Sequence, residues 1–342
     1  MTKLRVALVG YGVIGRRVAD AILLQPDMEL AGVAEVAADW RIRQAADKGF
    51  GLFAATADAE SPMRDAGLPL AGRLEDLAKA ADIVVDCTPK GLGAKNAETY
   101  RRIGRPFIVQ GGEKHEVTGH SFVAEASYES AQGKQATRVV SCNTTSIVRT
   151  LGALRRAGLL RKARGTLLRR ATDPWESHLG GIMNTLVPEP VIPSHQGPDA
   201  QTVDPDLDVV TIAIKVPETI GHLHAWSVEL TREASKDEVL SAFDTSPRIV
   251  PIASGDGLVA LNSVKEWMAD VGRPHDNLYE VALWTDSLAV RGNELFYNYM
   301  VDNQAIVVPE TIDAIRALVG TASATDSIRM TNETLGIGKL RG

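Results

Sequence analysis

The stretch that decides the fold of this chain is Leu4-Arg5-Val6-Ala7-Leu8-Val9-Gly10-Tyr11-Gly12-Val13-Ile14-Gly15. Leu4–Val9 is a short continuous apolar run, which is typical of a strand buried on both faces. The three glycines follow at once, and Arg16–Leu24 then carries apolar residues at helical spacing. An acidic residue, Glu35, stands about twenty residues after Gly15, so the stretch predicts the first strand, turn and helix of a dinucleotide-binding fold.

Each glycine has a separate task in such a fold. Gly10 allows the tight turn, Gly12 lets the backbone approach the pyrophosphate, and Gly15 lets the helix pack on the strand. The pyrophosphate then lies at the helix N-terminus, where unpaired N–H groups favour an anion. Glu35 would accept hydrogen bonds from the adenosine ribose and repel a 2′-phosphate, which favours NAD over NADP. Glu35 could instead be a solvated strand end, and Arg41 and Arg43 leave NADP as an alternative.

The rest of the chain predicts two domains. Further short apolar strands alternate with helices in the first half: Glu29–Glu35, Ile83–Thr88, Pro106–Gln110 and Arg138–Ser141. The second half has more strands and fewer helices: Gly165–Arg170, Asp208–Val216, Ala225–Leu230, Glu280–Trp284 and Glu294–Val301. We therefore expect an α/β fold, with a Rossmann-type doubly wound parallel sheet and an α+β catalytic domain whose sheet is mainly antiparallel. The expected domains are 1–141, joined by a C-terminal helical segment at 306–342, and 142–305.

Composition excludes several classes of protein. The chain has 342 residues, a formal net charge of −6 and no Lys/Arg block, which argues against partners such as nucleic acid or an anionic membrane surface. No run approaches the roughly 18 apolar residues of a membrane span. Two cysteines cannot build a disulfide framework, and a cytoplasmic location is the default expectation.

Cys142 is the candidate nucleophile. It lies where the Arg138–Ser141 strand gives way to a helix with an apolar face, so unpaired N–H groups are expected to lower the pKa of its thiol. Asn143 and the two threonines that follow add capping groups and donors for an oxyanion. A thiolate can attack an aldehyde, and the adduct can lose hydride to leave a thioester. Cys87, late in an apolar strand, fits a core residue better.

Two histidines, His222 and His224, are candidates for the base that the nucleophile needs. Their spacing in an extended chain aims both side chains the same way. A His-x-His pair also suits a metal, but no third ligand is evident from spacing, so we expect no metal site.

A phosphate site is suggested by Arg169, Arg170 and Thr172 at the end of a strand-like run. Paired arginines can hold a phosphate through bidentate hydrogen bonds, although a solvated basic strand end is the plainer alternative. The rigid polar loop Pro193–Pro198 is suited to a second anion contact.

Several motifs together identify a family resemblance. They are Gly10–Gly15, Gln110–His115, Ser141–Thr145, Leu168–Ala171, Val187–Pro190, Pro193–His195, Thr245–Ile249, Val307–Arg316 and Thr331–Ile337. With these motifs, nearly the whole chain resembles the archaeal-type (type II) phosphorylating glyceraldehyde-3-phosphate dehydrogenases.

The resemblance implies NAD-dependent oxidation of glyceraldehyde 3-phosphate with inorganic phosphate to 1,3-bisphosphoglycerate. It implies Cys142 as nucleophile and His222 as base, with His224 the less favoured choice. The residues that it places at the aldehyde phosphate and inorganic phosphate are Ser141, Asn143, His195 and Gln196. Those that it places at the cofactor are Val13, Ile14, Gly112, Arg170 and Gln304. The family also implies a homotetramer.

Three departures from the family's pattern affect substrate and cofactor. Many members carry His-His where this chain has His195-Gln196, and many carry Lys or Thr near Glu35 where NADP is accepted. Asp173–Gly181 replaces a more basic segment. The same chemistry on another phosphorylated or phosphonylated aldehyde, such as erythrose 4-phosphate, is therefore an alternative. A non-catalytic dinucleotide-binding regulatory protein is another.

Overall fold

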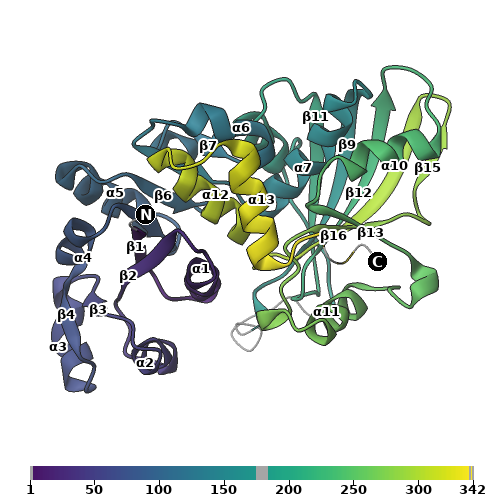
Figure 1. Cartoon of the computed structure of the whole chain (residues 1–342). Helices are drawn as coiled ribbons and strands as arrows, with labels where there is room; N and C mark the ends of the chain where they lie inside the picture. Colours follow the sequence, from purple (N-terminus) through teal and green to yellow (C-terminus); the bar gives the residue numbers. More distant parts are fainter. Residues whose placement is uncertain (1–2, 175–183, 339, 341–342) are drawn as a thin grey trace. The chain divides into compact units, whose positions relative to one another are not determined.

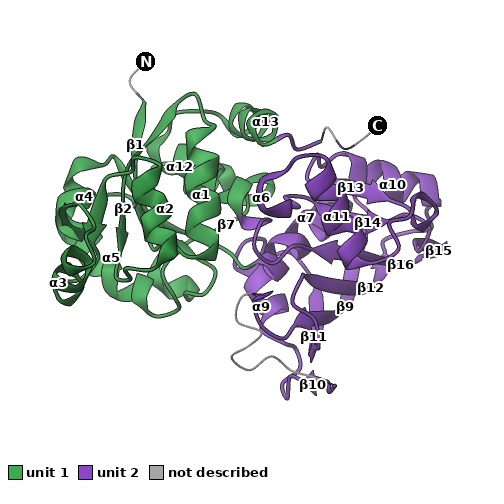
Figure 2. Cartoon of the chain, turned by 90° about the horizontal axis from the view of Figure 1, so that it is seen from below, with its two compact units in different colours: residues 1–141, 308–335 green, residues 142–307, 336–342 purple. Residues whose placement is uncertain are grey.

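The computed structural model describes residues 3–174, 184–338 and 340. The chain forms two compact units (Figure 2). The first comprises Met1–Ser141 with Val308–Leu335, and the second comprises Cys142–Val307 with Gly336–Gly342. Residues 306–307 and 336–342, which were expected with the first domain, group with the second unit.

The first unit is built on an eight-stranded sheet with the order β4-β3-β2-β1-β5-β6-β8-β7. All of its pairings are parallel. Its strands are β1 (Leu4–Val9), β2 (Met28–Glu35), β3 (Leu52–Ala54), β4 (Leu70–Arg73), β5 (Ile83–Asp86), β6 (Phe107–Gln110), β7 (Ser121–Phe122) and β8 (Ala136–Val139). The strand order reverses beside β1, so the carboxyl ends of β1 and β5 form the topological switch point where ligands of open α/β sheets bind. The predicted doubly wound parallel sheet is confirmed.

The helices of the first unit follow its strands in the alternation expected of this fold (Figure 1). They are α1 (Val13–Leu23), α2 (Trp40–Asp47), α3 (Ala57–Asp65), α4 (Leu74–Ala80), α5 (Leu92–Ile103), α6 (Ala124–Ala131), α12 (Val307–Val319) and α13 (Ala324–Leu335). Helix α12 is held to the rest of the unit by buried polar contacts. Arg316 Nη2 lies 2.7 Å from Asp27 Oδ1, and Glu310 accepts the backbone N–H of Ala124 at 2.6 Å.

The second unit carries a mixed, mainly antiparallel sheet with the order β10-β11-β9-β12-β16-β14-β13, and β15 pairs with β16. The β11–β9 and β13–β14 pairs are parallel, and the others are antiparallel. Its strands are β9 (Leu160–Arg170), β10 (Val187–Pro188), β11 (Val209–Val216), β12 (His222–Leu230), β13 (Ile249–Ile252), β14 (Val281–Trp284), β15 (Ala289–Arg291) and β16 (Glu294–Val301). Its helices are α7 (Cys142–Arg156), α9 (Gln196–Gln201), α10 (Lys236–Asp244) and α11 (Leu261–Asp270).

Some element boundaries predicted from the sequence were wrong. The short strands β3, β4, β7, β10, β13 and β15, of two to four residues each, were not predicted. Strand β12 begins at His222 rather than Ala225, so both candidate histidines belong to the sheet. The tail holds two helices rather than one, and the first begins at Val307, before Pro309. Proline is tolerated there because the first helical turn needs no intrahelical N–H bond.

No helix in the described part of the chain is long and apolar enough to cross a membrane.

Candidate active site

In the glycine loop after β1, side chains at Gly10 and Gly15 would collide with neighbouring backbone atoms. Gly10 has φ +85°, and a Cβ atom there would lie 3.0 Å from the carbonyl carbon of Cys87. A Cβ atom on Gly15 would lie 1.9 Å from the carbonyl oxygen of Gly10, so helix α1 can pack on β1 only through glycine. At Gly12 a Cβ atom would meet nothing within 4 Å. The loop is thus closed against the sheet and open in front of the helix, which fits a pyrophosphate at the N-terminus of α1.

Glu35 ends β2 with its carboxylate fixed by the backbone. One oxygen accepts the N–H of Tyr11 at 2.7 Å, and the other accepts the N–H of Val36 at 2.8 Å. Each oxygen keeps a further lone pair for a ribose hydroxyl. Val13 and Ile14 are the first two residues of α1 and are half-buried. The structure therefore brings these predicted cofactor residues to one edge of the parallel sheet.

The loop after β6 contains the predicted residue Gly112 and a carboxylate that sequence reasoning missed. Gly112 is exposed, whereas Glu113 is buried and accepts the backbone N–H of Gly91 at 2.7 Å. This bond ties the loop after β6 to the loop that precedes α5. An acidic residue in a glycine-rich loop gives no signal of such a role, because its partner is a backbone group more than twenty residues away.

Cys142 is the first residue of α7, directly after Ser141 and the end of β8. Its Sγ lies 3.3 Å from Nε2 of His222, the first residue of β12. The side-chain amide of Asn143 lies next to the same sulfur, with Nδ2 at 3.8 Å. A thiol, an imidazole and an amide donor therefore meet, although the cysteine and the histidine are 80 positions apart in the chain.

The backbone decides which nitrogen of His222 carries the proton. The N–H of Arg170, on β9, donates to Nδ1 of His222 at 3.0 Å. A nitrogen that accepts a hydrogen bond is unprotonated, so the hydrogen-bond network assigns the proton of the neutral ring to Nε2. Burial holds the pKa of His222 well below its usual value, and His224, Arg170 and Arg169 add to this effect. His222 is therefore neutral near pH 7, and its N–H points at the sulfur of Cys142.

The pKa of Cys142 differs from the sequence prediction. Burial raises it above the ordinary value for a thiol, and Arg170, Arg169 and a backbone hydrogen bond at Asn143 act in the opposite direction. The predicted lowering by the helix N-terminus was wrong, because removing the sulfur from water disfavours the thiolate more than these groups favour it. The two arginines, which stand at the end of β9, are nevertheless placed to stabilise an anion.

His224, the other candidate base, lies on the same face of β12 but does not reach the sulfur. Its Nε2 lies 2.8 Å from Oδ1 of Asn143, and its Nδ1 lies 2.8 Å from the hydroxyl of Tyr299. The prediction that both side chains point the same way is confirmed, since both are buried against α7 and its neighbours. Only His222 is in contact with Cys142.

The predicted phosphate residues Arg169 and His195 share a carboxylate that was not assigned a role from the sequence. Glu189 forms an ion pair with Nη1 of Arg169, and its other oxygen lies 3.6 Å from Nδ1 of His195. Burial lowers the pKa of His195, and the positive charge of Arg169 lowers it further. An incoming phosphate would thus compete with Glu189 for the guanidinium of Arg169.

Gln196 opens α9 and is fully buried. Among the described residues, neither its side-chain oxygen nor its side-chain nitrogen has a hydrogen-bond partner. A buried polar group without a partner is costly, so this amide is suited to a ligand or a water molecule. Thr172 follows the end of β9 by two residues and is half-buried.

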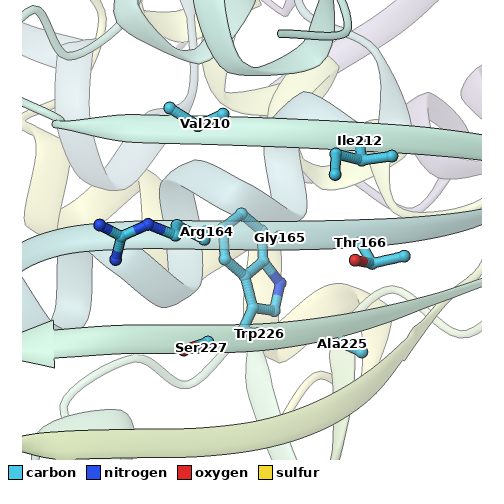
Figure 3. Close-up of a pocket in the computed structure, with 8 residues that line it drawn as sticks. All are labelled: Arg164, Gly165, Thr166, Val210, Ile212, Ala225, Trp226 and Ser227. Carbon is cyan, nitrogen blue, oxygen red and sulfur yellow. The ribbon is translucent and has the colours of Figure 1, made fainter. Parts of the chain in front are cut away.

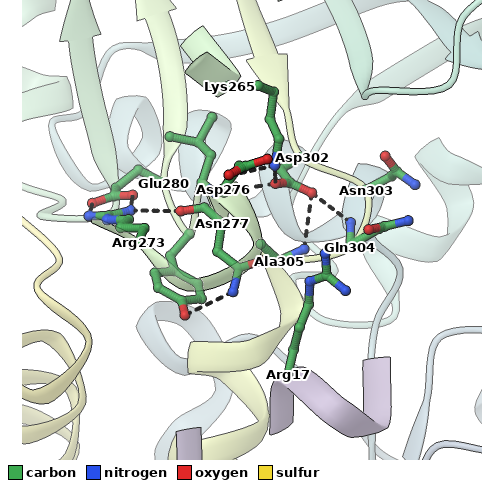
Figure 4. Close-up of polar contacts among 12 residues, drawn as sticks. Arg17, Lys265, Arg273, Asp276, Asn277, Glu280, Asp302, Asn303, Gln304 and Ala305 are labelled. Carbon is green, nitrogen blue, oxygen red and sulfur yellow. Dashed lines mark hydrogen bonds and ion pairs between the residues drawn. The ribbon is translucent and has the colours of Figure 1, made fainter. Parts of the chain in front are cut away.

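Gln304 lies in a network at the end of β16 (Figure 4). The carboxylate of Asp302 accepts the backbone N–H groups of Gln304 and Ala305 at 2.8 and 3.1 Å, and it pairs with Lys265 at 2.7 Å. The side-chain amide of Gln304 donates to Asp173 at 3.2 Å, and Arg170 Nη2 lies 3.4 Å from the same carboxylate. Arg170 and Gln304, the predicted cofactor residues of the second unit, are thus joined through Asp173. The altered segment that begins there continues into residues 175–181, which lie outside the described residues.

A shallow hollow on the sheet of the second unit contains none of the predicted site residues (Figure 3). It spans β11, β9 and β12 and is lined by Arg164, Gly165, Thr166, Val210, Ile212, Ala225, Trp226 and Ser227. Within the described part of the chain, no group of three or more His, Cys, Asp or Glu side chains could hold a metal ion.

Comparisons with known proteins give consistent results. Residues 141–273 match the model for the C-terminal domain of glyceraldehyde 3-phosphate dehydrogenase. The chain is 46% identical over 338 residues to a glyceraldehyde-3-phosphate dehydrogenase of Metallosphaera sedula, covering 98% of each chain. It is 46% identical over 335 residues to one of Pyrobaculum calidifontis, covering 97% of each chain. It is 45% identical over 342 residues to one of Archaeoglobus fulgidus, covering 99% of this chain and 100% of the other.

Proposed function

Because this chain belongs to the glyceraldehyde-3-phosphate dehydrogenase family, we propose that it oxidises glyceraldehyde 3-phosphate with inorganic phosphate to 1,3-bisphosphoglycerate. The observation that carries this proposal is the 3.3 Å contact between Sγ of Cys142 and Nε2 of His222. A cysteine paired with a neutral imidazole beside two arginines is suited to covalent catalysis on an aldehyde.

The thiol of Cys142 first loses its proton to solvent, because Nε2 of His222 already carries one. The thiolate then attacks the aldehyde carbon. A carbon–sulfur bond forms, and the electron pair of the carbonyl becomes an alkoxide. The N–H at Nε2 of His222 and the amide of Asn143 already point toward the sulfur, so both are placed to donate to that oxygen. In this tautomer His222 stabilises negative charge first as a donor. The sequence led us to expect His222 to act as a base at Nε2. That role needs the other tautomer, in which the proton is on Nδ1 and would face the backbone N–H of Arg170.

The alkoxide then collapses to a thioester as hydride leaves the same carbon. When bound, the oxidised nicotinamide ring of the coenzyme supplies the hydride acceptor. No base is needed at this step if the adduct is held as the alkoxide, which the two donors favour. Phosphate then attacks the thioester carbon, the acyl phosphate leaves, and the sulfur of Cys142 is released as thiolate.

Two polar regions are proposed for the phosphate groups. Ser141 and Asn143 flank the nucleophile in the sequence, and Arg169, Thr172, His195 and Gln196 lie at the ends of β9 and α9. The unpartnered buried amide of Gln196 supports a ligand there. Glu189 would affect the affinity for phosphate, because its ion pair with the guanidinium of Arg169 must break before a phosphate can bind that group.

The glycine loop fits a nicotinamide dinucleotide, with Gly10, Gly12, Gly15, Val13 and Ile14 at the pyrophosphate and Glu35 at the ribose. We propose NAD as the preferred coenzyme, since the fixed carboxylate of Glu35 would repel a 2′-phosphate, with NADP as the weaker alternative. Gly112, Arg170 and Gln304 are proposed as further cofactor residues on the family resemblance alone.

The experiment that tests the reaction compares wild type with Cys142→Ser. Wild type should turn over repeatedly only with aldehyde and phosphate together. Without phosphate it should form about one NADH per site, and mass spectrometry should then find an acyl adduct on Cys142. Cys142→Ser should lose at least about a thousandfold in kcat, since a hydroxyl is a much weaker nucleophile. Cys87→Ser is the matched control and should behave as wild type, because burial raises the pKa of that thiol.

Turnover that survives Cys142→Ser would contradict the covalent mechanism. Replacing glyceraldehyde 3-phosphate by erythrose 4-phosphate in the same assay separates the two substrate classes. A protein that binds dinucleotide but turns over no aldehyde would instead fit the regulatory alternative.

We also propose a cytoplasmic homotetramer in which the hollow on β11, β9 and β12 is covered by a second copy. Ile212 in that hollow is 40% exposed, and Val210, Thr166 and Ala225 beside it are half-buried. An apolar sheet face left open is typical of a surface that pairs. Light scattering of the purified protein measures the assembly directly.

A further inference from the structure

A chain of buried polar side chains lies behind Asn143 and has no counterpart in the reaction steps above. His224 is fully buried and stands between Asn143 of α7 and Tyr299 of β16. Its Nε2 lies 2.8 Å from Oδ1 of Asn143, and its Nδ1 lies 2.8 Å from the phenol oxygen of Tyr299. The phenol oxygen also lies 3.2 Å from Oγ of Ser146, which donates to the backbone carbonyl of Asn143 at 2.8 Å. His224 thus contacts the side-chain amide of Asn143, Tyr299 contacts His224, and Ser146 binds the backbone of Asn143.

The protonation of this chain follows from donor counting. Burial and, to a smaller extent, the positive charge of Arg169 lower the pKa of His224 to about 3, so the ring is neutral. A neutral imidazole has one donor and one acceptor nitrogen. The amide oxygen of Asn143 can only accept, so Nε2 carries the proton and Nδ1 receives the phenolic proton of Tyr299. The phenolic hydroxyl could donate to Nδ1 of His224 at 2.8 Å or to Oγ of Ser146 at 3.2 Å. Since Nδ1 is unprotonated, it is the acceptor.

We propose that His224 is a positioning residue, which holds the side-chain amide of Asn143 in the one orientation that aims its N–H₂ group at the sulfur of Cys142. This inference rests on the proposed cysteine chemistry. With Oδ1 bound to His224, Nδ2 of Asn143 lies 3.8 Å from Sγ. A flipped amide would turn its oxygen toward a thiolate and its N–H₂ group toward the N–H of His224. The oxygen would be repelled by the thiolate, whereas the ring could adapt by carrying its proton on Nδ1. The donor orientation is thus favoured by the charge on the sulfur and held by the Nε2 proton of His224.

The two histidines of β12 therefore have different roles. His222 is itself a donor to the sulfur, and its tautomer is fixed by the backbone of Arg170. His224 acts one residue further back: its Nε2 proton faces Oδ1 of Asn143, and its Nδ1 accepts from the hydroxyl of Tyr299. Each leaves one N–H aimed toward the nucleophile, either directly or through Asn143. Residues i and i+2 of a strand lie on the same face, so one ring can contact the sulfur while the other contacts Asn143 behind it.

The test compares His224→Leu, which removes both ring nitrogens, with His224→Gln, which keeps a donor at similar reach. We expect His224→Leu to lower kcat by about 10- to 100-fold with little change in the KM for aldehyde. This is less than the roughly 100- to 1000-fold cost of losing an oxyanion donor outright, because Asn143 itself remains. It should also slow alkylation of Cys142 by iodoacetamide at pH 7.5. His224→Gln should recover most of both losses. The ionisable groups that act on this sulfur are His222, Arg169, Arg170 and Asp302, and all are unchanged in these variants.

The decisive measurement is a double-mutant cycle with Asn143→Ala. If His224 acts through Asn143, His224→Leu should add less than about twofold to the loss caused by Asn143→Ala. Equal factors in both backgrounds, or an unchanged alkylation rate in a folded His224→Leu protein, would overturn the assignment. Should His224→Leu fail to fold, Tyr299→Phe keeps the ring in place, and an unchanged alkylation rate in that variant would overturn it as well. Alkylation needs neither aldehyde nor coenzyme, so it tests the positioning role even if the proposed oxidation is not observed.

Discussion

The glycine loop of the first unit and the thiol site of the second are built in opposite ways. The loop is specified by three glycines within six residues, and its geometry belongs to the backbone. The thiol site takes Cys142 from α7, His222 from β12 and the N–H of Arg170 from β9, and its geometry belongs mainly to side chains. A local backbone device can be recognised in a sequence, whereas a site assembled across a sheet needs the register of its strands. The two regions should also fail differently when mutated.

The largest effect is expected at Gly15. A Cβ atom there would lie 1.9 Å from the carbonyl oxygen of Gly10, so Gly15→Ala must push α1 away from β1. We expect a loss of about 3 kcal/mol in the free energy of unfolding. That loss corresponds to a fall of about 6–12 °C in Tm if each kcal/mol shifts Tm by about 2–4 °C. Thermal unfolding measures this, and NAD titration should show affinity reduced by at least about tenfold.

Gly12→Ala is the matched control for that variant. A Cβ atom at Gly12 meets nothing within 4 Å, so the melting temperature should stay close to that of wild type. The new methyl group would stand in the open space in front of α1, so NAD affinity should still fall. Equal melting temperatures for the two variants would show that the close packing at Gly15 is not what holds the loop.

A smaller effect is expected at Glu35, where the loop meets the ribose. Glu35→Gln keeps the size of the side chain and removes its charge, so it should raise the KM for NAD by severalfold and lower the KM for NADP. The ratio of kcat/KM for NAD to that for NADP should fall by about tenfold, which is about 1.4 kcal/mol of discrimination. An unchanged ratio would remove Glu35 from the choice of coenzyme. Asp82→Asn is a suitable control, because Asp82 lies before β5 and accepts the N–H of Arg5.

The sequence predicted the first of these regions almost completely. The buried strand, the glycines and Glu35 were found because apolar runs and φ-restricted turns are local signals, and the doubly wound sheet followed from their repetition. In the second unit the Cys142 helix and the two histidines were also recognised. Spacing alone could not separate the contacts of the two histidines, because the contact between Cys142 and His222 exists only once α7 lies against β12.

Three residues that support the candidate site were given no role from the sequence, although Glu113 and Glu189 lie in motifs of the family resemblance. Glu189, which binds Arg169, and Tyr299, which binds His224, act through partners on other strands. Glu113 acts through a backbone group. The pKa of Cys142 was mispredicted for a related reason, because the helix N-terminus can be read from the sequence but the burial of the sulfur cannot.

The smallest expected effect tests how burial and nearby positive charge act together on the pKa of Cys142. Because burial raises the pKa of Cys142, the rate of its alkylation by iodoacetamide should keep rising as the pH passes 9, rather than reaching a plateau near neutrality. Arg169 acts against burial, so Arg169→Gln should raise the pKa further and slow alkylation at pH 7.5 by about two- to fivefold, less than one pKa unit. Arg161→Gln, on the same strand but exposed and paired with Glu229, should leave the rate unchanged. A plateau below pH 7 would mean that the thiolate is favoured more strongly than its burial allows, and the helix N-terminus would then regain the role that the sequence predicted for it.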